Sequence, residues 1–424
     1  MIDKKRFKVV ALGCRTNQYE AAAYVSQLQK LGYEEAKEGE EAELCIVNTC
    51  TVTESADSSS RHQIRQLSRL HPDAKLVVTG CLAERLPQEI GQIPNVDLVV
   101  SNKQKESLLS LALPDQELPE FEISHFPAHT RAFVKVQDGC NSFCTYCIIP
   151  YVRGRSRSRR LEDIMREVNG LIQNGYKEVV LTGINIGDFD GAPAEGEERV
   201  RLSTLVSSVD AVEGIKRVRI SSIDPDEVDD ELLQAVIGGK RTCPSMHVVL
   251  QSGSNVVLKR MNRKYTRQDF IQCVEKLRKA RPDFTFTTDI IVGFPGETEK
   301  DFEETLEVME EVKFAKVHMF PYSERARTRA ALFTNKVPPD VIQERKQRVL
   351  RLAEKHAFEL RENYIGKEVQ VLLESDRETL PGYLEGHTEN FLPVFVPSAG
   401  LRANDLVTVR CVQNHPQGLI GSRD

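Results

Sequence analysis

The sequence lacks the features that mark secreted, membrane-spanning or strongly basic proteins. It contains no apolar run long enough to span a bilayer, and the apolar stretch in its first residues, MIDKKRFKVVALGC, is too short for a signal peptide. It also lacks a basic excess, because 57 Lys and Arg stand against 63 Asp and Glu, a formal net charge of −6. Any contact with nucleic acid must therefore be local. We expect a cytoplasmic protein with no membrane partner.

The sequence does contain enough chain for more than one core, and many cysteines. For 424 residues, two or three domains are expected. A hydrophobic content of 40% and a charged content of 28% are typical of a globular protein in water. Ten cysteines without a secretory signal indicate a reducing compartment, in which thiols bind metals or act in catalysis.

Three cysteines lie close together in the segment VQDGCNSFCTYCIIPYVRG, with the spacing Cys140-x3-Cys144-x2-Cys147. Three such thiolates can converge on one iron-sulfur cluster. A four-iron cluster normally takes four thiolates, so three leave one iron open to a substrate or cofactor. The alternatives are a zinc site or three buried cysteines without a ligand role. We favour the cluster, because zinc usually takes four ligands in paired CxxC units, and His125 and His129 lie outside the motif.

Three further cysteines end apolar runs in the first part of the chain: FKVVALGC ends at Cys14, ELCIVNTC at Cys50 and KLVVTGC at Cys81. Short Val, Leu and Ile runs that alternate with helix-like segments predict βαβ units and a parallel sheet. These cysteines would then lie at the carboxyl edge of one sheet, where open α/β sheets bind ligands. They could form a second three-thiolate site, although each alone would be an ordinary core cysteine. The cysteines outside both patterns are assigned to packing: Cys45, Cys243, Cys273 and Cys411.

After Cys147, strand-like runs again alternate with helix-like segments. The runs are KEVVLTGINIGD, KRVRISSIDPDE, MHVVLQSGSN, FTFTTDIIVGFPGET and AKVHMFPYSER. With the strand before Cys140, they predict about six βα units, and hence a parallel barrel or part of one. A long helix is expected over 340–363. From residue 361 on, short β-rich runs such as EVQVLLES predict a small barrel of the type that oligonucleotide binders use.

Local positive charge occurs in two arginine-rich segments and in one helix. YVRGRSRSRR directly follows the cysteine triplet, and this position favours phosphate contact, although a charge run is also typical of a solvated surface. The second segment is YSERARTRA, and the helix over 341–361 has six Lys or Arg against three Asp or Glu. The arginines that we single out are Arg153, Arg155, Arg157, Arg325, Arg327 and Arg329.

The CxxxCxxC motif with an aromatic residue before its last cysteine, here Tyr146, resembles the signature of the radical S-adenosylmethionine (SAM) enzymes. The resemblance implies that Cys140, Cys144 and Cys147 bind a [4Fe–4S] cluster, that the open iron binds SAM, and that an electron from the cluster cleaves SAM to a 5′-deoxyadenosyl radical. GFPGET resembles the segment near the adenine and ribose of SAM. The SAM contacts expected on this basis are Tyr146, Gly183, Ser221, Ser222, Gln251, Ser252 and Gly293.

Over nearly the full chain, the order of segments is similar to that of the methylthiotransferases. GCRTN, NTC, TGC, QDGCNSFCTYCIIPYVRGRSRSR, LQSGSNVVLKRMNRKYT and FPYSER carry the resemblance. It implies an N-terminal open parallel α/β methylthiotransferase domain at 1–120, a radical SAM core with a partial (β/α)6 barrel at 126–358, and a TRAM-type RNA-binding β-barrel at 361–424. It also implies an auxiliary [4Fe–4S] cluster on Cys14, Cys50 and Cys81 that holds the inserted sulfur, tRNA as partner, and an electron donor such as flavodoxin or ferredoxin.

Within that family, QDGC, YCIIP, RVRISSID and FPYSER look most like the enzymes that methylthiolate C2 of N6-threonylcarbamoyladenosine beside the tRNA anticodon, at position 37. The threonylcarbamoyl carboxylate calls for a cation, and Arg325, Arg327 and Arg329 are the candidates, because Arg binds carboxylates through paired hydrogen bonds. A solvated turn is the equal alternative. The rival substrates are isopentenyladenosine in tRNA and a ribosomal-protein aspartate. A rival of another class is a noncatalytic iron-sulfur RNA-binding protein.

Overall fold

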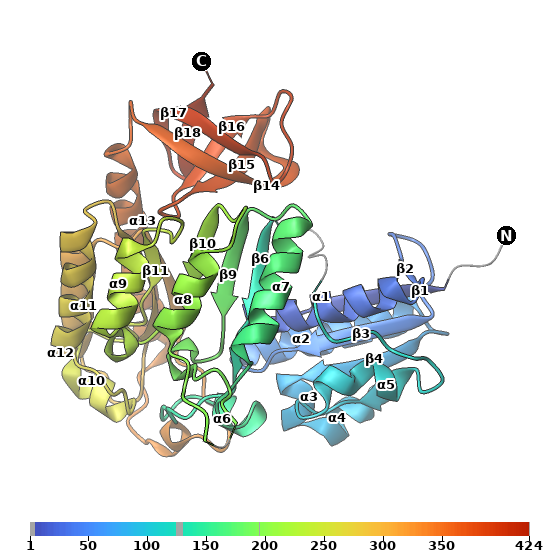
Figure 1. Ribbon diagram of the computed structural model, residues 1–424. Coiled ribbons are helices and arrows are strands. Elements are labelled where there is room, and N and C mark those ends of the chain that lie inside the picture. Colours follow the sequence, from blue (N-terminus) through green and yellow to red (C-terminus); the bar gives the residue numbers. More distant parts are fainter. Residues whose placement is uncertain (1–4, 124–129, 195, 424) are drawn as a thin grey trace. The chain divides into compact units, whose positions relative to one another are not determined.

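Figure 1 shows the computed structural model of the chain, which describes residues 5–123, 130–194 and 196–423. The described residues group into two compact units. The cysteine unit comprises the described parts of 1–127 together with 137–157 and 323–331, and the barrel unit comprises those of 128–136, 158–322 and 332–424. Each unit combines separate stretches of the chain, so these units do not test the three predicted domain ranges, which stay predictions. The predicted start of the core at residue 126 lies outside the described residues.

A five-stranded parallel sheet in the order β2-β1-β3-β4-β5 forms the centre of the cysteine unit. Every side chain of β3 is buried, as expected for a central strand that is covered on both faces. The strands are β1 (Arg6–Ala11), β2 (Glu34–Glu35), β3 (Leu44–Thr49), β4 (Lys75–Gly80) and β5 (Val96–Val99). The helical elements are α1 (Arg15–Lys30), α2 (Glu54–Leu70), α3 (Cys81–Arg85), α4 (Pro87–Gly91), η1 (Lys105–Ser107), α5 (Leu108–Ala112) and α6 (Ile149–Val152).

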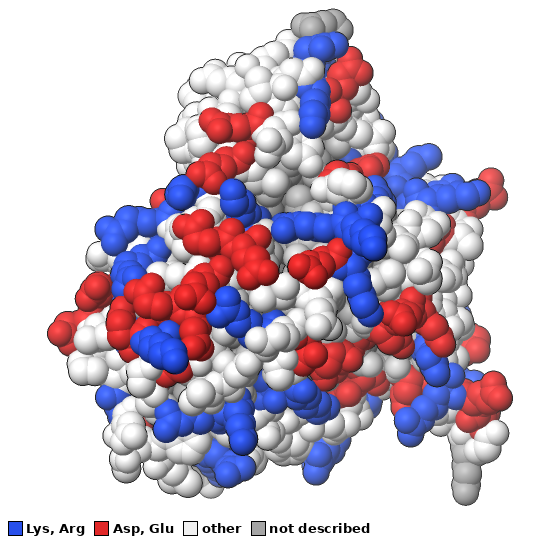
Figure 2. Space-filling view, turned by 90° about the vertical axis from the view of Figure 1, so that its left-hand side faces the viewer, with Lys and Arg blue, Asp and Glu red and all other residues white. Residues whose placement is uncertain are grey.

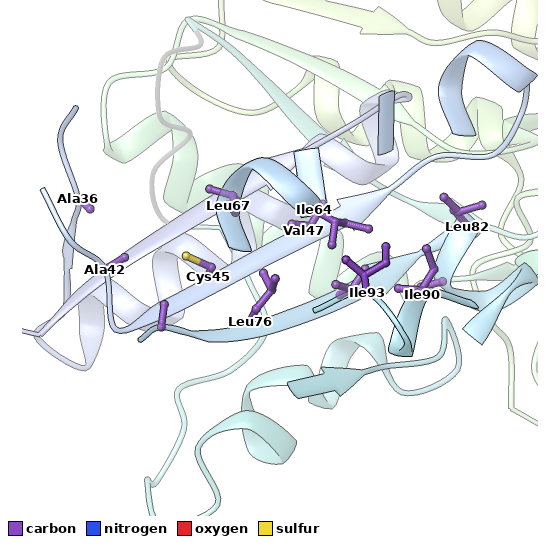
Figure 3. Close-up of a cluster of buried hydrophobic side chains, with 13 residues drawn as sticks. Ala36, Ala42, Cys45, Val47, Ile64, Leu67, Leu76, Leu82, Ile90 and Ile93 are labelled. Carbon is purple, nitrogen blue, oxygen red and sulfur yellow. The ribbon is translucent and has the colours of Figure 1, made fainter. Parts of the chain in front are cut away.

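Helices cover both faces of this sheet. Successive side chains of each strand point to opposite sides, so a central strand packs against helices on both faces. On one face, Tyr24 and Leu28 of α1 pack in a cluster with Ile46 of β3. On the other, Ile64 of α2 packs in a cluster with Cys45, the neighbour of Ile46. Figure 3 shows the sulfur of Cys45 among these apolar side chains. The prediction that Cys45 is a packing residue is therefore confirmed.

Six parallel strands form the centre of the barrel unit, in two sheets ordered β10-β9-β6 and β11-β12-β13. Parallel bridges from Val218 to Thr242 and from Ile223 to Val248 connect the two sheets. The predicted partial (β/α)6 barrel is confirmed. The strands are β6 (Arg131–Lys135), β9 (Glu178–Thr182), β10 (Arg217–Ile220), β11 (Ser245–His247), β12 (Thr285–Val292) and β13 (Lys316–Pro321), and β7 (Gln137–Asp138) and β8 (Arg157–Ser158) are short. The helices are α7 (Leu161–Gln173), α8 (Leu202–Asp210), α9 (Asp230–Gly238), α10 (Asn255–Arg260), α11 (Arg267–Ala280), α12 (Glu299–Val312) and α13 (Pro339–Glu362).

A closed five-stranded barrel in the order β14-β15-β16-β18-β17 ends the chain, shown in red in Figure 1. Its strands are β14 (Glu368–Leu380), β15 (Tyr383–Thr388), β16 (Pro393–Pro397), β17 (Leu406–His415) and β18 (Gly418–Ser422). Val371, Val394 and Val409 belong to its buried core. The predicted small C-terminal β-barrel is confirmed, and it is consistent with a TRAM-like domain. In the described part of the chain, every helix is too short or too polar to cross a membrane.

Two buried arginines of β10 hold the C-terminal barrel against the parallel strands. Arg217 donates to the carbonyl oxygens of Gln370 and His387 at 2.7 and 2.8 Å. Arg219 donates to two further barrel carbonyls, each at 2.8 Å, and to a carboxylate oxygen of Glu178 at 2.6 Å. These contacts satisfy two buried charges. They also give a role to the two arginines of the segment RVRISSID, which the sequence did not single out.

Candidate functional site

The three N-terminal cysteines lie at one edge of the sheet in the cysteine unit. The strands β1, β3 and β4 pair in parallel, and Cys14, Cys50 and Cys81 follow their carboxyl ends. Cys14 is the N-cap of α1 and Cys81 is the first residue of α3. Gly13 has φ +87°, and a Cβ there would lie 2.7 Å from the sulfur of Cys50. Glycine therefore lets the loop that carries Cys14 approach Cys50 closely.

Burial and a nearby cation act in opposite directions on these thiols. Burial raises the pKa of Cys50 to about 12 and also raises the pKa of Cys81, whereas Cys14 is exposed. The guanidinium of Arg153 lowers the pKa of both buried thiols, because positive charge stabilises the thiolate. Metal ligation requires the thiolate. The site therefore combines two buried candidate ligands, Cys50 and Cys81, with a charge that favours the thiolate form.

This donor set fits an iron-sulfur cluster better than a single ion. Among the described residues, no three His, Cys, Asp or Glu side chains stand close enough to hold one metal ion. The ligands of a four-iron cluster each bind a different iron and so need not converge on one point. Three thiols at the ends of neighbouring strands, with a cation beside them, match that requirement. A zinc site would need a fourth ligand around one centre.

The second cysteine set, Cys140, Cys144 and Cys147, lies on the loop between β7 and α6, in the same unit. The N–H of Ser142 donates to the sulfur of Cys140 at 3.3 Å, a contact that favours the thiolate. The N–H of Cys147 donates to the carbonyl oxygen of Cys144 at 3.0 Å and closes a turn between them. Phe143 has φ +47°, so the loop contains a left-handed residue between its first two cysteines.

The two cysteine sets are neighbours within the cysteine unit. Cys81 of the first set packs in a cluster with Ile148 and Val152, which follow the second set in the chain. Asn102 donates to the carbonyl oxygen of Val152 at 2.7 Å. Tyr146, a predicted SAM contact, is a partly exposed residue of the same loop. The sequence treated the two sets as separate sites, and the structure brings the surrounding segments into contact.

Most of the other predicted SAM contacts lie at the carboxyl ends of the parallel strands in the barrel unit. Gly183 follows β9, Ser221 and Ser222 follow β10, and Gly293 follows β12. Within the described residues, the hydroxyl of Ser221 and the side-chain carbonyl of Gln251 are buried without a hydrogen-bond partner. Gln251 also has φ +63°. Unsatisfied buried polar atoms cost free energy, and a polar ligand at these strand ends would supply their partners.

Two other predicted SAM contacts, Ser252 and Gly293, have partners within the chain. The hydroxyl of Ser252 lies 3.4 Å from that of Thr305. The N–H of Gly293 donates to Glu297 at 2.7 Å, and a Cβ at Gly293 would lie 2.4 Å from Ile342 of α13. The glycine therefore permits the close approach of a helix. The backbone N–H of Gly293 is therefore already bound within the chain.

The arginines predicted to contact tRNA fall into two groups. Arg153 and Arg325 are only 3% and 4% exposed. Arg153 pairs with Glu20 and Asp138, and Arg325 pairs with Asp57 at 2.7 Å. Burial and ion pairing leave little of these two guanidinium groups exposed to a ligand, and the tRNA contacts predicted for them stay predictions. The other four are exposed: Arg155, Arg157, Arg327 and Arg329.

The predicted basic helix is α13, and ion pairs neutralise part of its charge. Arg345 pairs with Glu297 at 2.7 Å, and Arg348 pairs with Glu299 at 2.7 Å and also with Glu303. Figure 2 shows Lys and Arg intermingled with Asp and Glu on the side of the molecule that carries α11 and α12 in Figure 1. The expected basic track on this helix is therefore interrupted by carboxylates from the preceding segment.

Sequence reasoning missed the residues that surround the cysteine sets. Glu20, Lys105 and Asp138 are buried, and Lys105 and Arg153 each pair with both Glu20 and Asp138. One signal was present, because Glu20 stands in the apolar segment YEAAAYV, where a buried carboxylate needs a cation. Nothing local marks Lys105 or Asp138. Their partners lie far away in the chain.

A second missed group lies on the barrel strands β11, β12 and β13. The Nδ1 atom of His247 is 2.9 Å from the hydroxyl of Thr287, and its Nε2 atom is 3.4 Å from a carboxylate oxygen of Asp289. The ring of His318 lies 5.7 Å from that of His247. These side chains can accept and donate protons. Their spacing in the sequence follows no motif, so only the strand pairing brings them together.

Comparison with known proteins gives consistent matches. The model of the Radical SAM superfamily matches residues 134–309, and that of Uncharacterized protein family UPF0004 matches residues 6–101. The threonylcarbamoyladenosine tRNA methylthiotransferase MtaB of Chlamydia pneumoniae is 49% identical, covering 99% of this chain and 98% of that protein. MtaB of Bacillus subtilis is 38% identical, covering 90% and 88%. The tRNA-2-methylthio-N(6)-dimethylallyladenosine synthase of Caldicellulosiruptor saccharolyticus is 36% identical, covering 96% and 87%.

Solved structures agree on the fold. The radical SAM methyltransferase TsrM from Kitasatospora setae, solved with cobalamin and a [4Fe-4S] cluster, has a TM-score of 0.56 and 13% identity, covering 76% of this chain and 75% of that one. At this identity the likeness shows the fold alone. The radical SAM fold implies a [4Fe–4S] cluster and SAM as cofactors. The chain is thus a transferase and belongs to the family of radical SAM methylthiotransferases.

Proposed function

We propose that the enzyme adds a methylthio group to C2 of N6-threonylcarbamoyladenosine at position 37 of tRNA, next to the anticodon, giving 2-methylthio-N6-threonylcarbamoyladenosine. A relative of 49% identity, aligned over 99% of this chain, carries the name of that nucleoside. Two further relatives with the same name are 38% and 36% identical. The name supports the reaction, and the arginine segment 323–331 supports the choice of nucleoside.

The two cysteine sets and the strand ends would hold the cofactors. When bound to Cys140, Cys144 and Cys147, a [4Fe–4S] cluster supplies the electron for cleavage of SAM. When bound to Cys14, Cys50 and Cys81, an auxiliary cluster supplies an open iron for the sulfur to be inserted. The buried, unpartnered polar atoms of Ser221 and Gln251 are the strongest SAM contacts in the barrel unit. The weaker proposals are Tyr146, Gly183, Ser222, Ser252 and Gly293.

The position of the arginine segment 323–331 is the observation that carries the substrate proposal. These residues belong to the cysteine unit, although the residues on either side belong to the barrel unit. The N–H of Ala330 donates to the carbonyl oxygen of Thr145 at 2.8 Å, in the loop between Cys144 and Cys147. Arg325 donates to Asp57 at 2.7 Å and so fixes the start of the segment. The end of the segment is therefore anchored in the cysteine loop, and its start is anchored to Asp57, which also accepts from the hydroxyl of Thr51, the residue after Cys50.

Arg327 and Arg329 lie between those anchors and are exposed. Arg327 has φ +74°, a conformation uncommon for arginine and consistent with a constrained turn. A guanidinium binds a carboxylate through two parallel hydrogen bonds. These two side chains are accordingly suited to the carboxylate of the threonylcarbamoyl group. A dimethylallyl group has no charge with which they could pair.

Other contacts to tRNA follow from the exposed residues after the triplet and from the C-terminal barrel. The guanidinium of Arg155 lies 4.4 Å from the ring centre of Phe143 in the cysteine loop, and half-exposed Arg157 donates to Asp138 at 2.8 Å. Both remain proposals for phosphate contact. We further propose that residues 361–424 are a TRAM-type RNA-binding domain, that flavodoxin or ferredoxin supplies electrons, and that the enzyme acts in the cytoplasm.

Anaerobic turnover tests the function directly. Reconstituted protein is given SAM, a reductant, a sulfur source and tRNA that carries N6-threonylcarbamoyladenosine, and the nucleosides are analysed by mass spectrometry. We expect the 2-methylthio product. The Arg327→Ala/Arg329→Ala double variant should raise the KM for this tRNA about tenfold or more, because a hydrogen bond to a charged group contributes about 1.5–3 kcal/mol. Arg166→Ala, an exposed arginine of α7, is the matched control and should leave the KM unchanged.

Three results would count against the proposal in different ways. No methylthio product from this tRNA, with 5′-deoxyadenosine still formed, would reject the nucleoside and keep the radical chemistry. A double variant that matches wild type would reject the arginine pocket. If the enzyme modifies tRNA that carries dimethylallyladenosine and does not modify the first tRNA, dimethylallyladenosine would become the proposed substrate. Relatives that are 36% and 34% identical carry the name of that nucleoside. These relatives are the reason to keep dimethylallyladenosine in tRNA as the second candidate substrate. The third candidate substrate is an aspartate of a ribosomal protein.

A further inference from the structure

Five charged side chains of the cysteine unit form one connected set, here called the buried charge network: Glu20, Lys105, Asp138, Arg153 and Arg157. The ammonium of Lys105 lies 2.5 Å from a carboxylate oxygen of Glu20 and 2.5 Å from one of Asp138. The Nη1 atom of Arg153 lies 3.2 Å from Glu20 and 2.8 Å from Asp138. The side chains of Glu20 and Arg153 are 0% exposed, so four of the five charges have left water almost completely.

The network connects the segments that carry the two cysteine sets. Glu20 is on α1, the helix that begins after Cys14, and Asp138 and Arg153 flank the triplet in the chain. The Nη2 atom of Arg153 also donates to the side-chain oxygen of Asn17. That same oxygen accepts a long contact from the sulfur of Cys14 at 3.8 Å. Arg153 is thus one hydrogen-bonded residue away from a cysteine of the first set.

Arg153 has a hydrogen-bond donor that the partners named above do not use. Its Nε–H is buried without a hydrogen-bond partner among the described residues, although both of its Nη atoms are bound. A buried donor without an acceptor costs free energy. Ligation would create a thiolate at Cys14, which contacts the same Asn17 oxygen as Arg153, and so would place negative charge near this guanidinium.

We propose that Arg153 is the counter-cation of the Cys14, Cys50 and Cys81 thiolates and positions this cysteine set from the segment that also carries Cys140, Cys144 and Cys147. The inference rests on the auxiliary cluster of the proposed function. Cluster binding by Cys14, Cys50 and Cys81 would then depend on Arg153, a residue that follows Cys147 in the chain. This role of Arg153 also explains why an arginine directly after the triplet points inward while Arg155, two residues later, is exposed.

A counter-cation has an electrochemical consequence that a purely structural residue lacks. Positive charge near a cluster stabilises its more negative, reduced state and raises its reduction potential. Removing the charge of Arg153 should therefore shift the potential of the auxiliary cluster to more negative values. Lysine at this position keeps the charge but loses the planar fork that contacts Asn17, Glu20 and Asp138 together.

The test uses full-length protein in which Cys140, Cys144 and Cys147 are replaced by Ala, so that only the auxiliary site can hold a cluster. Iron and sulfide are measured for each variant, and the midpoint potential is followed by electron paramagnetic resonance. Arg153→Gln should shift the potential negative, and Arg153→Lys should stay closer to the parent. Arg69→Gln, an exposed arginine at the end of α2 in the same unit, is the control and should cause no shift.

A double variant covers the case in which Arg153→Gln fails to fold. Arg153→Gln/Glu20→Gln removes one buried charge of each sign and leaves Lys105 paired with Asp138. Arg153 binds Asn17, whose side-chain oxygen contacts the sulfur of Cys14, and Glu20 contacts Arg153 and Lys105, so a smaller negative shift should remain. An unchanged potential in the double variant, or equal loss of iron in the Lys and Gln variants, would overturn the role of the charge. A parent protein that binds no cluster would instead reject the auxiliary site itself, and the inference with it.

Discussion

Replacing Arg219 by Ala should loosen the C-terminal barrel and leave the cysteine sites intact. The side chain is 6% exposed, pairs with Glu178 at 2.6 Å and donates to two barrel carbonyls at 2.8 Å. Breaking a buried ion pair by removing one partner costs about 3–5 kcal/mol, because the other charge stays buried. Arg217, 3.8 Å from Glu178, retains part of the compensation. We therefore expect a loss near the lower limit, about 3 kcal/mol.

Hydrogen exchange followed by mass spectrometry measures this loss locally, in the strands of the barrel. A loss of about 3 kcal/mol corresponds to roughly a hundredfold faster exchange of protected barrel amides. Arg410→Ala is the control, because its pair with Glu368 is at least half exposed and should contribute less than about 1 kcal/mol. If Arg219→Ala accelerates exchange less than tenfold, the two arginines of β10 do not hold the barrel. The iron content should not change in either variant, since all six candidate ligands lie in the cysteine unit.

Three further outcomes are expected. Burial opposes ionisation of Glu374, but the cations beside it lower its pKa from 4.5 to about 2. The stability that this carboxylate contributes is therefore present above pH 4.5 and is lost as the pH falls toward 2. Thermal unfolding of the wild type should show this loss, and Glu374→Gln should reduce the pH dependence of the melting temperature. Cys50→Ala should abolish auxiliary iron, whereas Cys45→Ala should keep it; equal iron in both would contradict the ligand assignment. Gly293→Ala, at φ +75° and 2.4 Å from Ile342, should destabilise by about 1–3 kcal/mol and recover partly when Ile342→Ala is added, as thermal melts would show.

The parts of the architecture that local periodicity determines were predictable. Alternating apolar runs and helix-like segments predicted both parallel sheets, because a buried strand needs a continuous apolar stretch and its crossover helix needs an amphipathic one. The cysteines at strand ends followed from the same logic, since parallel strands end at one edge. Cys45 was separated from Cys50 by register alone, and its apolar surroundings confirm the distinction.

The direction in which an arginine points could not be predicted. In YVRGRSRSRR the residues Arg153, Arg155 and Arg157 look equivalent, yet the first is buried, the second lies over an aromatic ring and the third is half exposed. The difference arises from acids that are distant in sequence. Glu20 lies 133 residues from Arg153 along the chain, and no pattern near either residue reveals the pair. Buried polar partners are specified by topology, which a single sequence does not display.

Arg325 shows the same limit and its functional consequence. The sequence grouped it with Arg327 and Arg329 as one carboxylate-binding turn, but its partner Asp57 lies 268 residues away on α2. Asp57 also accepts from Arg85 at 2.7 Å, so one buried carboxylate holds two cations from separate segments. The guanidinium of Arg325 is buried in this ion pair and is hardly exposed to a ligand. Arg325 instead anchors the segment in which Arg327 and Arg329 are exposed, so the anchoring arginine and the two arginines proposed to bind substrate can be substituted separately.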